Sequence, residues 1–299
     1  MGVDRRTALK GMAVAGAALL ASGPGDHARE PHPAPSDAVG MLYDATLCIG
    51  CKTCVVACRE ANDMPPERTA LGGGIYDSPI SLDGQTRNII KLYEGTDGKS
   101  SYMKSQCMHC LDPACVGACM IGALQKREHG IVTWDGNRCI GCRYCQVACP
   151  YLIPKFTWDK AIPKIVKCEM CSQRIAEGKI PGCCEVCPRS AVIFGKCDDL
   201  LAEAKSRLKK NPDRYYPKVF GEKDGGGSQV LYLSKAGISF TDLGLPALGD
   251  TPVPELSQEI QHAAYKGFIA PAVLYVALGT VIWRNKRAEA QAQGKEEKP

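Results

Sequence analysis

The stretch RCIGCRYCQVACP (residues 138–150) contains four of the chain's 18 cysteines. Two residues separate Cys139 from Cys142 and Cys142 from Cys145, and three residues separate Cys145 from Cys149. Thiols at this density can pair as disulfides, hold one metal site together, or belong to different sites. The rest of the sequence decides among these possibilities.

The cysteines of the 299-residue chain fall into four groups of related spacing. Groups one and three repeat one another, because the segments CIGC and VAC occur in both and an aspartate precedes each group. Groups two and four share a C-x2-C pair followed by a C-x3-C pair. The groups are Cys48, Cys51, Cys54 and Cys58 (one); Cys107, Cys110, Cys115 and Cys119 (two); Cys139, Cys142, Cys145 and Cys149 (three); and Cys168, Cys171, Cys183 and Cys187 (four).

Short apolar runs flank the cysteine groups. Residues 41–43 and 131–134 precede groups one and three, and we predict that they form strands leading into a cysteine loop. Residues 122–124 and 191–194 follow groups two and four after a turn of small residues. Two kinds of half-motif are thus each used twice, which predicts a duplicated α+β fold.

The spacing of group three suits an iron–sulfur cubane, which needs four thiolates around a compact cage. Three cysteines two residues apart let a tight loop wrap the cage, and Gly50 and Gly141 inside such loops permit close backbone approach. Cys149 falls one helical turn after Cys145 and faces away from that cage. In two-cluster bacterial ferredoxins the corresponding cysteine ligates the other cluster. Group three is therefore predicted to give three ligands to one cluster and one to its neighbour.

Other uses of cysteine fit this pattern less well. A structural zinc site uses two separated C-x2-C pairs and needs no third cysteine at the same spacing. Disulfides do not explain a repeated spacing, and a redox-active dithiol needs only one C-x-x-C. Cys183 is the predicted ligand because it restores C-x3-C with Cys187, with Cys184 as a possible substitute. Cys197 is expected to be a small buried hydrophobe.

The overall composition excludes several classes of protein. The chain is too long for a small disulfide-stapled domain, and only 6% of its residues are aromatic, so bound metal is expected to contribute to stability. The formal net charge is +5 with neutral cysteines, but four cluster-bound thiolate sets of about −2 each would bring it to about −3. The apparent basicity therefore does not indicate nucleic-acid binding.

The N-terminal residues 1–28 are predicted to be a twin-arginine export signal. Arg5 and Arg6 precede a weakly apolar run rich in alanine and glycine (residues 11–23). This route exports folded proteins, which suits a protein whose cofactors are inserted in the cytoplasm and used outside it. The cleavage site is not apparent.

The C-terminal part is predicted to contain a membrane helix. Residues 265–283 include a stretch of seventeen residues without a charge, 267–283, which as a helix covers about 25 Å. Basic residues open the tail 284–299, which the positive-inside tendency places in the cytoplasm. Residues 201–262 are expected to form an extension and linker, including an amphipathic helix at 200–210 and a proline-containing connection at 242–258.

Residues 40–200 resemble the four-cluster ferredoxin-like electron-transfer subunits of membrane oxidoreductases. The segments GMLYDATLCIGC, KSQCMHCLDPAC, GIVTWDGNRCIGCRYCQVACPY and PGCCEVCPRSAVIFG carry the resemblance. It implies duplicated bacterial-ferredoxin-like domains with insertions that hold four [4Fe-4S] clusters, groups one and four forming one half and groups two and three the other. The implied ligands are Cys48, Cys51, Cys54 and Cys187 for cluster 1; Cys58, Cys168, Cys171 and Cys183 for cluster 2; Cys107, Cys110, Cys115 and Cys149 for cluster 3; and Cys119, Cys139, Cys142 and Cys145 for cluster 4.

Two later segments narrow the resemblance. GEKDGGGSQVLYL (221–233) and IQHAAYKGFIAP (260–271), with the export signal and terminal helix, are similar to HybA-like iron–sulfur subunits of quinone-reactive nickel–iron hydrogenases. This similarity implies a non-catalytic subunit at the periplasmic face of the bacterial inner membrane. Its implied partners are the hydrogenase small and large subunits and an integral membrane subunit that meets quinone.

Alternative functions remain open at the level of sequence. A subunit of a molybdopterin oxidoreductase such as formate dehydrogenase would carry the same clusters, but usually travels on its partner's signal. A disulfide-rich exported binding protein would be colourless, and a self-contained reductase would turn over substrate without partners. No Ser-His-Asp set, phosphate loop or paired acid and base stands out, so no catalytic residue is expected. His109, between two cysteines, is either a cluster-tuning donor or a packed loop residue.

Overall fold

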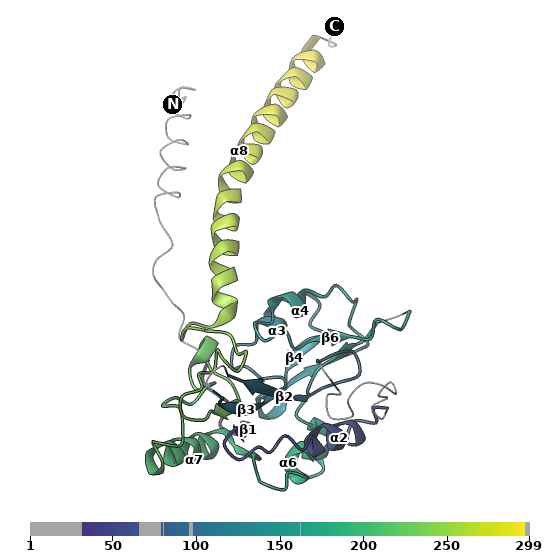
Figure 1. Cartoon of the computed structure of the whole chain (residues 1–299). Helices are drawn as coiled ribbons and strands as arrows, with labels where there is room; N and C mark the ends of the chain where they lie inside the picture. Colours follow the sequence, from purple (N-terminus) through teal and green to yellow (C-terminus); the bar gives the residue numbers. More distant parts are fainter. Residues whose placement is uncertain (1–31, 66–78, 80, 96–97, 162, 297–299) are drawn as a thin grey trace. The chain divides into compact units, whose positions relative to one another are not determined.

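The computed structural model divides into two units, shown in Figure 1. Residues 29–254 form a compact unit, and the chain from Glu255 onward belongs to a second one. The predicted export signal, 1–28, lies outside the described residues. The structure describes residues 32–65, 79, 81–95, 98–161 and 163–296, excluding the side chains at 256–266, 269–270 and 292–296.

A three-stranded sheet forms the centre of the compact unit. Strand β1 (Val39–Asp44) pairs antiparallel with β8 (Val192–Lys196) and parallel with β9 (Val230–Leu233). Because side chains alternate across a strand, Met41 of β1 packs into the main core, whereas Leu42 packs against helix α7 (Cys197–Lys210) on the opposite face. Both faces of β1 are therefore buried.

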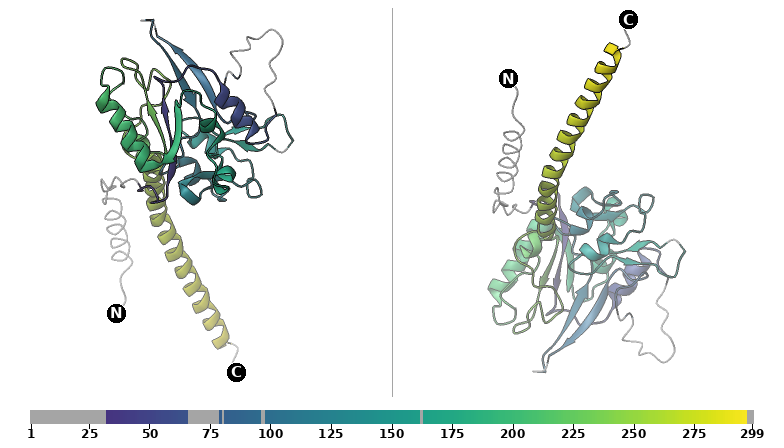
Figure 2. Two further views of the ribbon diagram at one scale, coloured as in Figure 1. Left: turned by 90° about the horizontal axis from the view of Figure 1, so that it is seen from below. Right: turned by 90° about the horizontal axis from the view of Figure 1, so that it is seen from above.

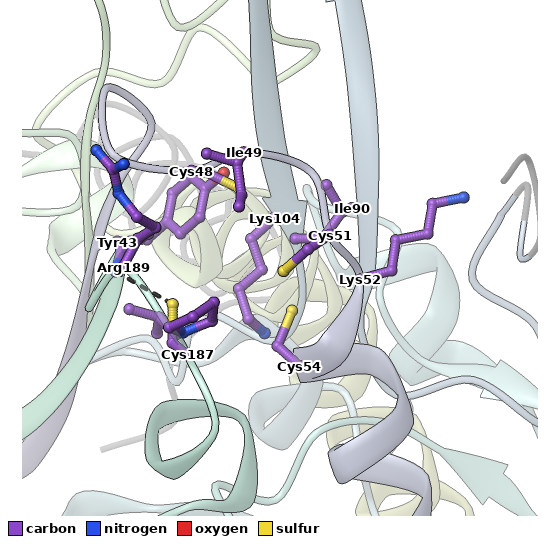
Figure 3. Close-up of a pocket in the computed structure, with 13 residues that line it drawn as sticks. Tyr43, Cys48, Ile49, Cys51, Lys52, Cys54, Ile90, Lys104, Cys187 and Arg189 are labelled. Carbon is purple, nitrogen blue, oxygen red and sulfur yellow. Dashed lines mark hydrogen bonds between the residues drawn. The ribbon is translucent and has the colours of Figure 1, made fainter.

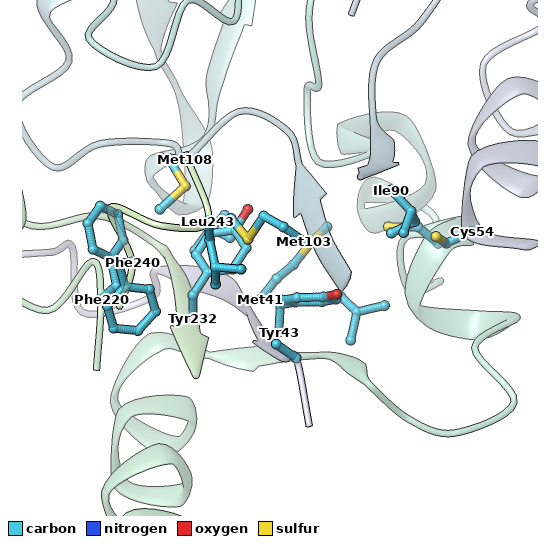
Figure 4. Packing of buried hydrophobic residues seen from close by; sticks show 14 of the residues in the cluster. Met41, Tyr43, Cys54, Ile90, Met103, Met108, Phe220, Tyr232, Phe240 and Leu243 are labelled. Carbon is cyan, nitrogen blue, oxygen red and sulfur yellow. The ribbon is translucent and has the colours of Figure 1, made fainter. Parts of the chain in front are cut away.

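The main core combines aromatic and sulfur-containing side chains (Figure 4). Tyr43 meets Tyr232 edge to face, with ring centroids 5.5 Å apart. Met41, Met103 and Met108 fill the space around these rings. Cys54 belongs to the same core cluster, so a predicted metal ligand is continuous with the packed interior.

A second set of elements repeats the pattern of the first. Strand β4 (Leu124–Lys126) pairs antiparallel with β5 (Val132–Trp134), as β1 pairs with β8. Helix α3 (Ala114–Gly117) contacts α4 (Tyr144–Ala148), as α2 (Thr53–Glu60) contacts α6 (Gly182–Glu185). The remaining elements of this unit are β6 (Lys155–Phe156), β7 (Ile165–Val166), α5 (Ser172–Ala176) and the 3-10 turns Glu128–Gly130 and Asp224–Gly226.

The two CIGC loops also share a backbone conformation. Gly50 and Gly141 both have φ of +71°. The following residues Lys52 and Arg143 are left-handed as well, with φ of 57° and 69°. Glycine adopts such angles without strain, whereas other residues do so rarely. The sequence repeat is therefore a repeat of local geometry.

Several predicted elements occur, with shifted bounds. Strand β2 (Ile89–Glu94) forms with β3 (Ser100–Ser105) the hairpin that projects from the unit in Figure 2. The helix expected from residue 200 begins at Cys197. The extension expected at 201–262 is part of the core, because every residue of β9 is buried in the sheet.

The C-terminal helix α8 runs over Val253–Glu296, with Pro271 inside it, so a helix begins within the connection expected at 242–258. In the part of the chain that the structure describes, no helix is both long and apolar enough to cross a membrane. The membrane helix predicted over 265–283 is therefore not supported, although the side chains at 265–266 and 269–270 lie outside the description.

Candidate metal centres

The cysteines assigned to cluster 1 line one small pocket (Figure 3), called site 1 below. Three of them, Cys48, Cys51 and Cys54, lie on the loop and first turn between β1 and α2. Cys187 reaches the same pocket from the segment that follows α6. Group one therefore meets group four in space. Cys58, one turn beyond Cys54 on α2, is not among the residues that line site 1.

The cysteines assigned to cluster 4 line a second pocket, site 4. Cys139, Cys142 and Cys145 come from the loop before α4 and its first turn, and Cys119 follows α3. Helix α4 ends at Ala148, so Cys149 lies just beyond it in an extended conformation, with φ of −79° and ψ of 113°. The short helix expected to run from Cys145 to Cys149 is thus shifted by one residue toward the N-terminus, and the backbone turns at the cysteine that leaves the loop.

Site 2 is the set Cys58, Cys168, Cys171 and Cys183. Burial raises the pKa of Cys168 well above its ordinary value, and the neighbouring Cys58, Cys183 and Cys171 raise it further. The amide Nδ2 of Asn62 lies 3.7 Å from the sulfur of Cys58 and 3.9 Å from that of Cys171. The four thiols come from α2, the loop before α5, and α6.

Site 3 is the set Cys107, Cys110, Cys115 and Cys149. Desolvation of its thiol raises the pKa of Cys110 well above the ordinary value, and Cys107, Cys115 and Cys149 raise that pKa further. Cys149 therefore lies with group two and away from the three cysteines that precede it in the sequence. This placement is what the crossed ligand sets require, and the ligand sets themselves stay a prediction.

The adjacent cysteines Cys183 and Cys184 differ in their contacts with site 2. Cys183 is almost fully buried, and a hydrogen bond from Cys184 lowers the pKa of the Cys183 thiol to about 6. After burial, Cys183 has the largest effect in raising the pKa of the Cys58 thiol. These contacts favour Cys183 as the member of site 2. Cys197 is half-buried at the start of α7, and burial raises the pKa of its thiol to about 11.

Backbone amides donate to sulfurs at equivalent places in the two halves. The N–H of Ala191 lies 3.2 Å from the sulfur of Cys187 in site 1, and the N–H of Ala123 lies 3.2 Å from the sulfur of Cys119 in site 4. Each donor is four residues after its cysteine, in the turn of small residues that precedes a strand. Such donors stabilise negative charge on sulfur and influence the reduction potential of a bound cluster.

The donor sets suit thiolate-bound metal. A thiol that coordinates a metal ion is deprotonated even where burial favours its neutral form. No disulfide joins any of the 18 cysteines, all of which lie within the described residues. Each site offers four sulfur donors, the set that [4Fe-4S] clusters use.

A site for a single metal ion has a different geometry from a site for an iron–sulfur cluster. Four thiolates around one zinc ion, at about 2.3 Å each, would lie about 3.8 Å from one another. Within the described chain, no three His, Cys, Asp or Glu side chains lie close enough to hold a single metal ion. A cubane cluster places four irons between its thiolates, so it takes a wider cage than one ion does.

The four sites lie in series. Site 1 adjoins site 2, site 2 adjoins site 3, and site 3 adjoins site 4, because a cysteine of each site packs in the same buried cluster as a cysteine of the next. The adjoining pairs are Cys54 with Cys183, Cys168 with Cys107, and Cys115 with Cys145. Exposed cysteines occur only at the two ends of the series, Cys51 in site 1 and Cys142 in site 4.

Residues that the sequence alone did not single out surround the thiols. Lys104 and Lys167 are buried lysines among the sites. His109, for which tuning and packing were both open, is completely buried, and its Nδ1 accepts a hydrogen bond of 3.1 Å from the N–H of Val132. Because Nδ1 accepts, the proton of the neutral ring is on Nε2, a buried atom with no hydrogen-bond partner in the described structure. Only the position of His109 within CMHC signalled it in advance.

Comparison with known proteins supports an iron–sulfur protein of the 4Fe-4S kind. Residues 99–197 match the family described as "4Fe-4S dicluster domain". Over 87% of its length the chain is 40% identical to the Hydrogenase-2 operon protein HybA of Escherichia coli O157:H7, covering 88% of that protein. Over 65% of its length it is 36% identical to the nitrate-inducible formate dehydrogenase iron-sulfur subunit of Escherichia coli K12, covering 67% of that subunit. A formate dehydrogenase iron-sulfur subunit of Haemophilus influenzae is 32% identical over a similar share.

Proposed function

Because the chain belongs to the HybA family of iron–sulfur proteins, we propose that it relays single electrons through four [4Fe-4S] clusters. In this proposal sites 1 to 4 each bind one cluster through the four cysteines named above. The observation that carries the proposal is the arrangement of sixteen cysteines as four sets in series, with exposed cysteines at the two ends. A series of redox sites with accessible ends is what a relay between two partners requires.

When bound, each cluster would accept one electron and pass one on, so the chain itself neither gains nor loses electrons in a full cycle. The protein's residues hold the sites in order and exclude water between them. Cys107, Cys168 and Cys183 are buried at the inner sites. Amide donors such as the N–H of Ala191 offset negative charge at sulfur. No residue of the chain is assigned a bond-making role, and the chain is proposed to be non-catalytic.

The ends of the series are proposed docking points for partner subunits. Ile49 and Val56 are exposed beside Cys51 at site 1, and Ile140 and Val147 are exposed around site 4. Exposed apolar side chains that flank an accessible redox site support contact with another protein there. The partners proposed are the small subunit of a nickel–iron hydrogenase, with its large subunit, and an integral membrane subunit that reduces quinone. Hydrogen oxidation would thus be coupled to quinone reduction.

A second candidate is a relay in a molybdopterin oxidoreductase. The observation that favours it is the similarity to formate dehydrogenase iron-sulfur subunits. The similarity to the hydrogenase-2 operon protein covers more of the chain and is higher, so the hydrogenase assignment is preferred. Affinity purification of the complex decides between them: nickel in the purified complex supports the first candidate, and molybdenum supports the second.

Iron analysis tests the cluster number. The full-length chain, purified under anaerobic conditions, should contain about sixteen iron atoms, four per cluster. Chemical reduction should give electron paramagnetic resonance signals from all four sites. Iron near half that value, or stoichiometric zinc, would show that the four-cluster proposal is wrong.

We also propose that the chain works outside the cytoplasm, at the inner membrane. Arg5 and Arg6 in the predicted signal support export. Membrane association does not require a spanning helix, because exposed apolar side chains of α8, such as Tyr275 and Trp283, can contact lipid or a membrane subunit. The test replaces Arg5 and Arg6 together by lysine. The variant should accumulate in the cytoplasm, and undiminished export would contradict the proposal.

A further inference from the structure

Lys104 is a completely buried lysine at the wall of site 1. It lies near the end of β3, with 0% of its surface exposed, and it lines the same pocket as Cys48, Cys54 and Cys187. Figure 3 shows its side chain running into the pocket so that the ammonium group lies near Cys54. Its Nζ donates a hydrogen bond to the side-chain oxygen of Gln106. That amide is neutral, so the positive charge needs another counterpart.

The counterpart is the site itself. Cys48, Cys54 and Cys187 line the same pocket as Lys104, and a four-iron cluster held there by four thiolates would carry a charge of about −2. Such a cluster would keep Lys104 protonated in spite of its burial.

Resting on the four-cluster relay proposed above, we propose that Lys104 is a fixed cation that raises the reduction potential of the cluster in site 1. Adding one electron to a cluster makes it more negative. A buried cation beside it stabilises the reduced form, because Coulomb interactions are strong where water is excluded. Lys104 thus changes the free energy of adding an electron at site 1 and is itself neither oxidised nor reduced.

A second buried lysine supplies the comparison. Lys167 donates hydrogen bonds to the carbonyl oxygens of Val132 and Cys168. Its charge lowers the pKa of Cys115 of site 3 against burial. Lys167 is not among the residues that line the pocket of site 1. Its charge is therefore expected to act on site 3 and to leave site 1 unchanged.

The test is a potentiometric titration of the full-length, cluster-loaded chain, followed by electron paramagnetic resonance. Lys104→Met removes the charge and keeps most of the side-chain volume. It should make the cluster of site 1 at least tenfold harder to reduce at a fixed potential, which is 59 mV for one electron. Lys104→Arg keeps the charge and should leave the potential of site 1 near that of the unmodified chain.

Two control variants sharpen the result. Lys91→Met removes an exposed lysine from the adjacent strand β2 and should shift no cluster. Lys167→Met should shift site 3 and leave site 1 unchanged. Four intact clusters with unchanged potentials in Lys104→Met would overturn the proposal, as would equal shifts at all four sites.

Cluster loss is also informative. If Lys104→Met loses iron and Lys104→Arg keeps it, the charge is needed to assemble site 1, which supports the proposal. If Lys104→Arg loses iron as well, shape rather than charge is what the position requires, and the proposal fails. Failure of the relay proposal is separate, because it would be seen as low iron in the unmodified chain.

Discussion

Substituting Cys149 tests the crossed ligand sets most directly. The residue lies four positions after Cys145, yet the structure places it with Cys107, Cys110 and Cys115. Backbone N–H groups of Ile153, Tyr151 and Leu152 donate toward its sulfur and lower its pKa, against the larger effect of burial, which raises it. The position is thus arranged for a sulfur that carries negative charge, and a serine hydroxyl there is a poorer ligand for iron.

The expected magnitude follows from one ligand in one site. Cys149→Ser removes one of the four donors of site 3 and none of site 4, so the iron content should fall from about sixteen to about twelve atoms per chain. Iron analysis measures the loss, and electron paramagnetic resonance of the reduced chain identifies which signal disappears. Cys145→Ser, only four residues away, should instead remove the signal of site 4.

The reasoning would be refuted by the opposite pattern. If Cys149→Ser loses the site 4 cluster and keeps that of site 3, the two ligand sets are exchanged. If it keeps all sixteen irons, Cys149 is not a ligand. Cys197→Ser is the matched control, because Cys197 contacts the side chain of Gln229 and belongs to none of the four sites; that variant should keep its full iron content.

Three further predictions concern the protein around the clusters, each read from chemical or thermal unfolding of the loaded chain. Gly50→Ala should destabilise the protein more than Gly141→Ala. Both residues have φ of +71°, and this shared backbone strain costs about 1 kcal/mol. A Cβ at Gly50 would also lie 2.3 Å from the ring of Tyr102, whereas one at Gly141 meets nothing within 4 Å, so equal losses of stability would contradict the clash. Arg207→Leu should lower the free energy of unfolding by about 2 kcal/mol, because Nη1 of Arg207 donates at 3.0 Å to the fully buried carboxylate of Asp44. Glu203→Gln alters the exposed partner of Arg207 and should lower it by less than about 0.5 kcal/mol. A larger loss in Glu203→Gln than in Arg207→Leu would refute this account. Leu231→Ala should lower the free energy of unfolding by about 3 kcal/mol, because the Leu231 side chain in β9 is only 5% exposed. Leu92→Ala should be nearly neutral, because Leu92 is 53% exposed. A small effect of Leu231→Ala would mean that β9 adds little to the core.

Much of the local structure was predictable from the sequence. The loop conformation of CIGC depends on residues within a few positions, and the glycine in it accepts a left-handed angle that other residues resist. The strands at 41–43 and 131–134 occur as parts of β1 and β5. Cys149 was expected to leave the site of Cys145, and it does so, although through an extended residue after the helix and not through the helix itself.

Other features depend on contacts between distant parts of the chain. Resemblance indicated which cysteine groups meet, but the serial order of the sites appears only in contacts such as Cys168 with Cys107. The stretch expected as an extension contributes β9 to the central sheet. That placement was hidden, because a short apolar run such as QVLYL is compatible with several environments.

By itself the sequence determined the chemistry of this protein: four sets of thiols, their loops, and the duplication that repeats them. Spacing along the chain fixes those features, since they involve neighbours within one or two turns. Only the tertiary structure decided what lies between the sets. Lys104 looks like an ordinary lysine in the sequence, and its burial beside Cys54 arises because segments 48–54 and 187–192 meet it in one pocket. Long-range packing sets the local dielectric and the charges that each site experiences, and no spacing rule contains that information.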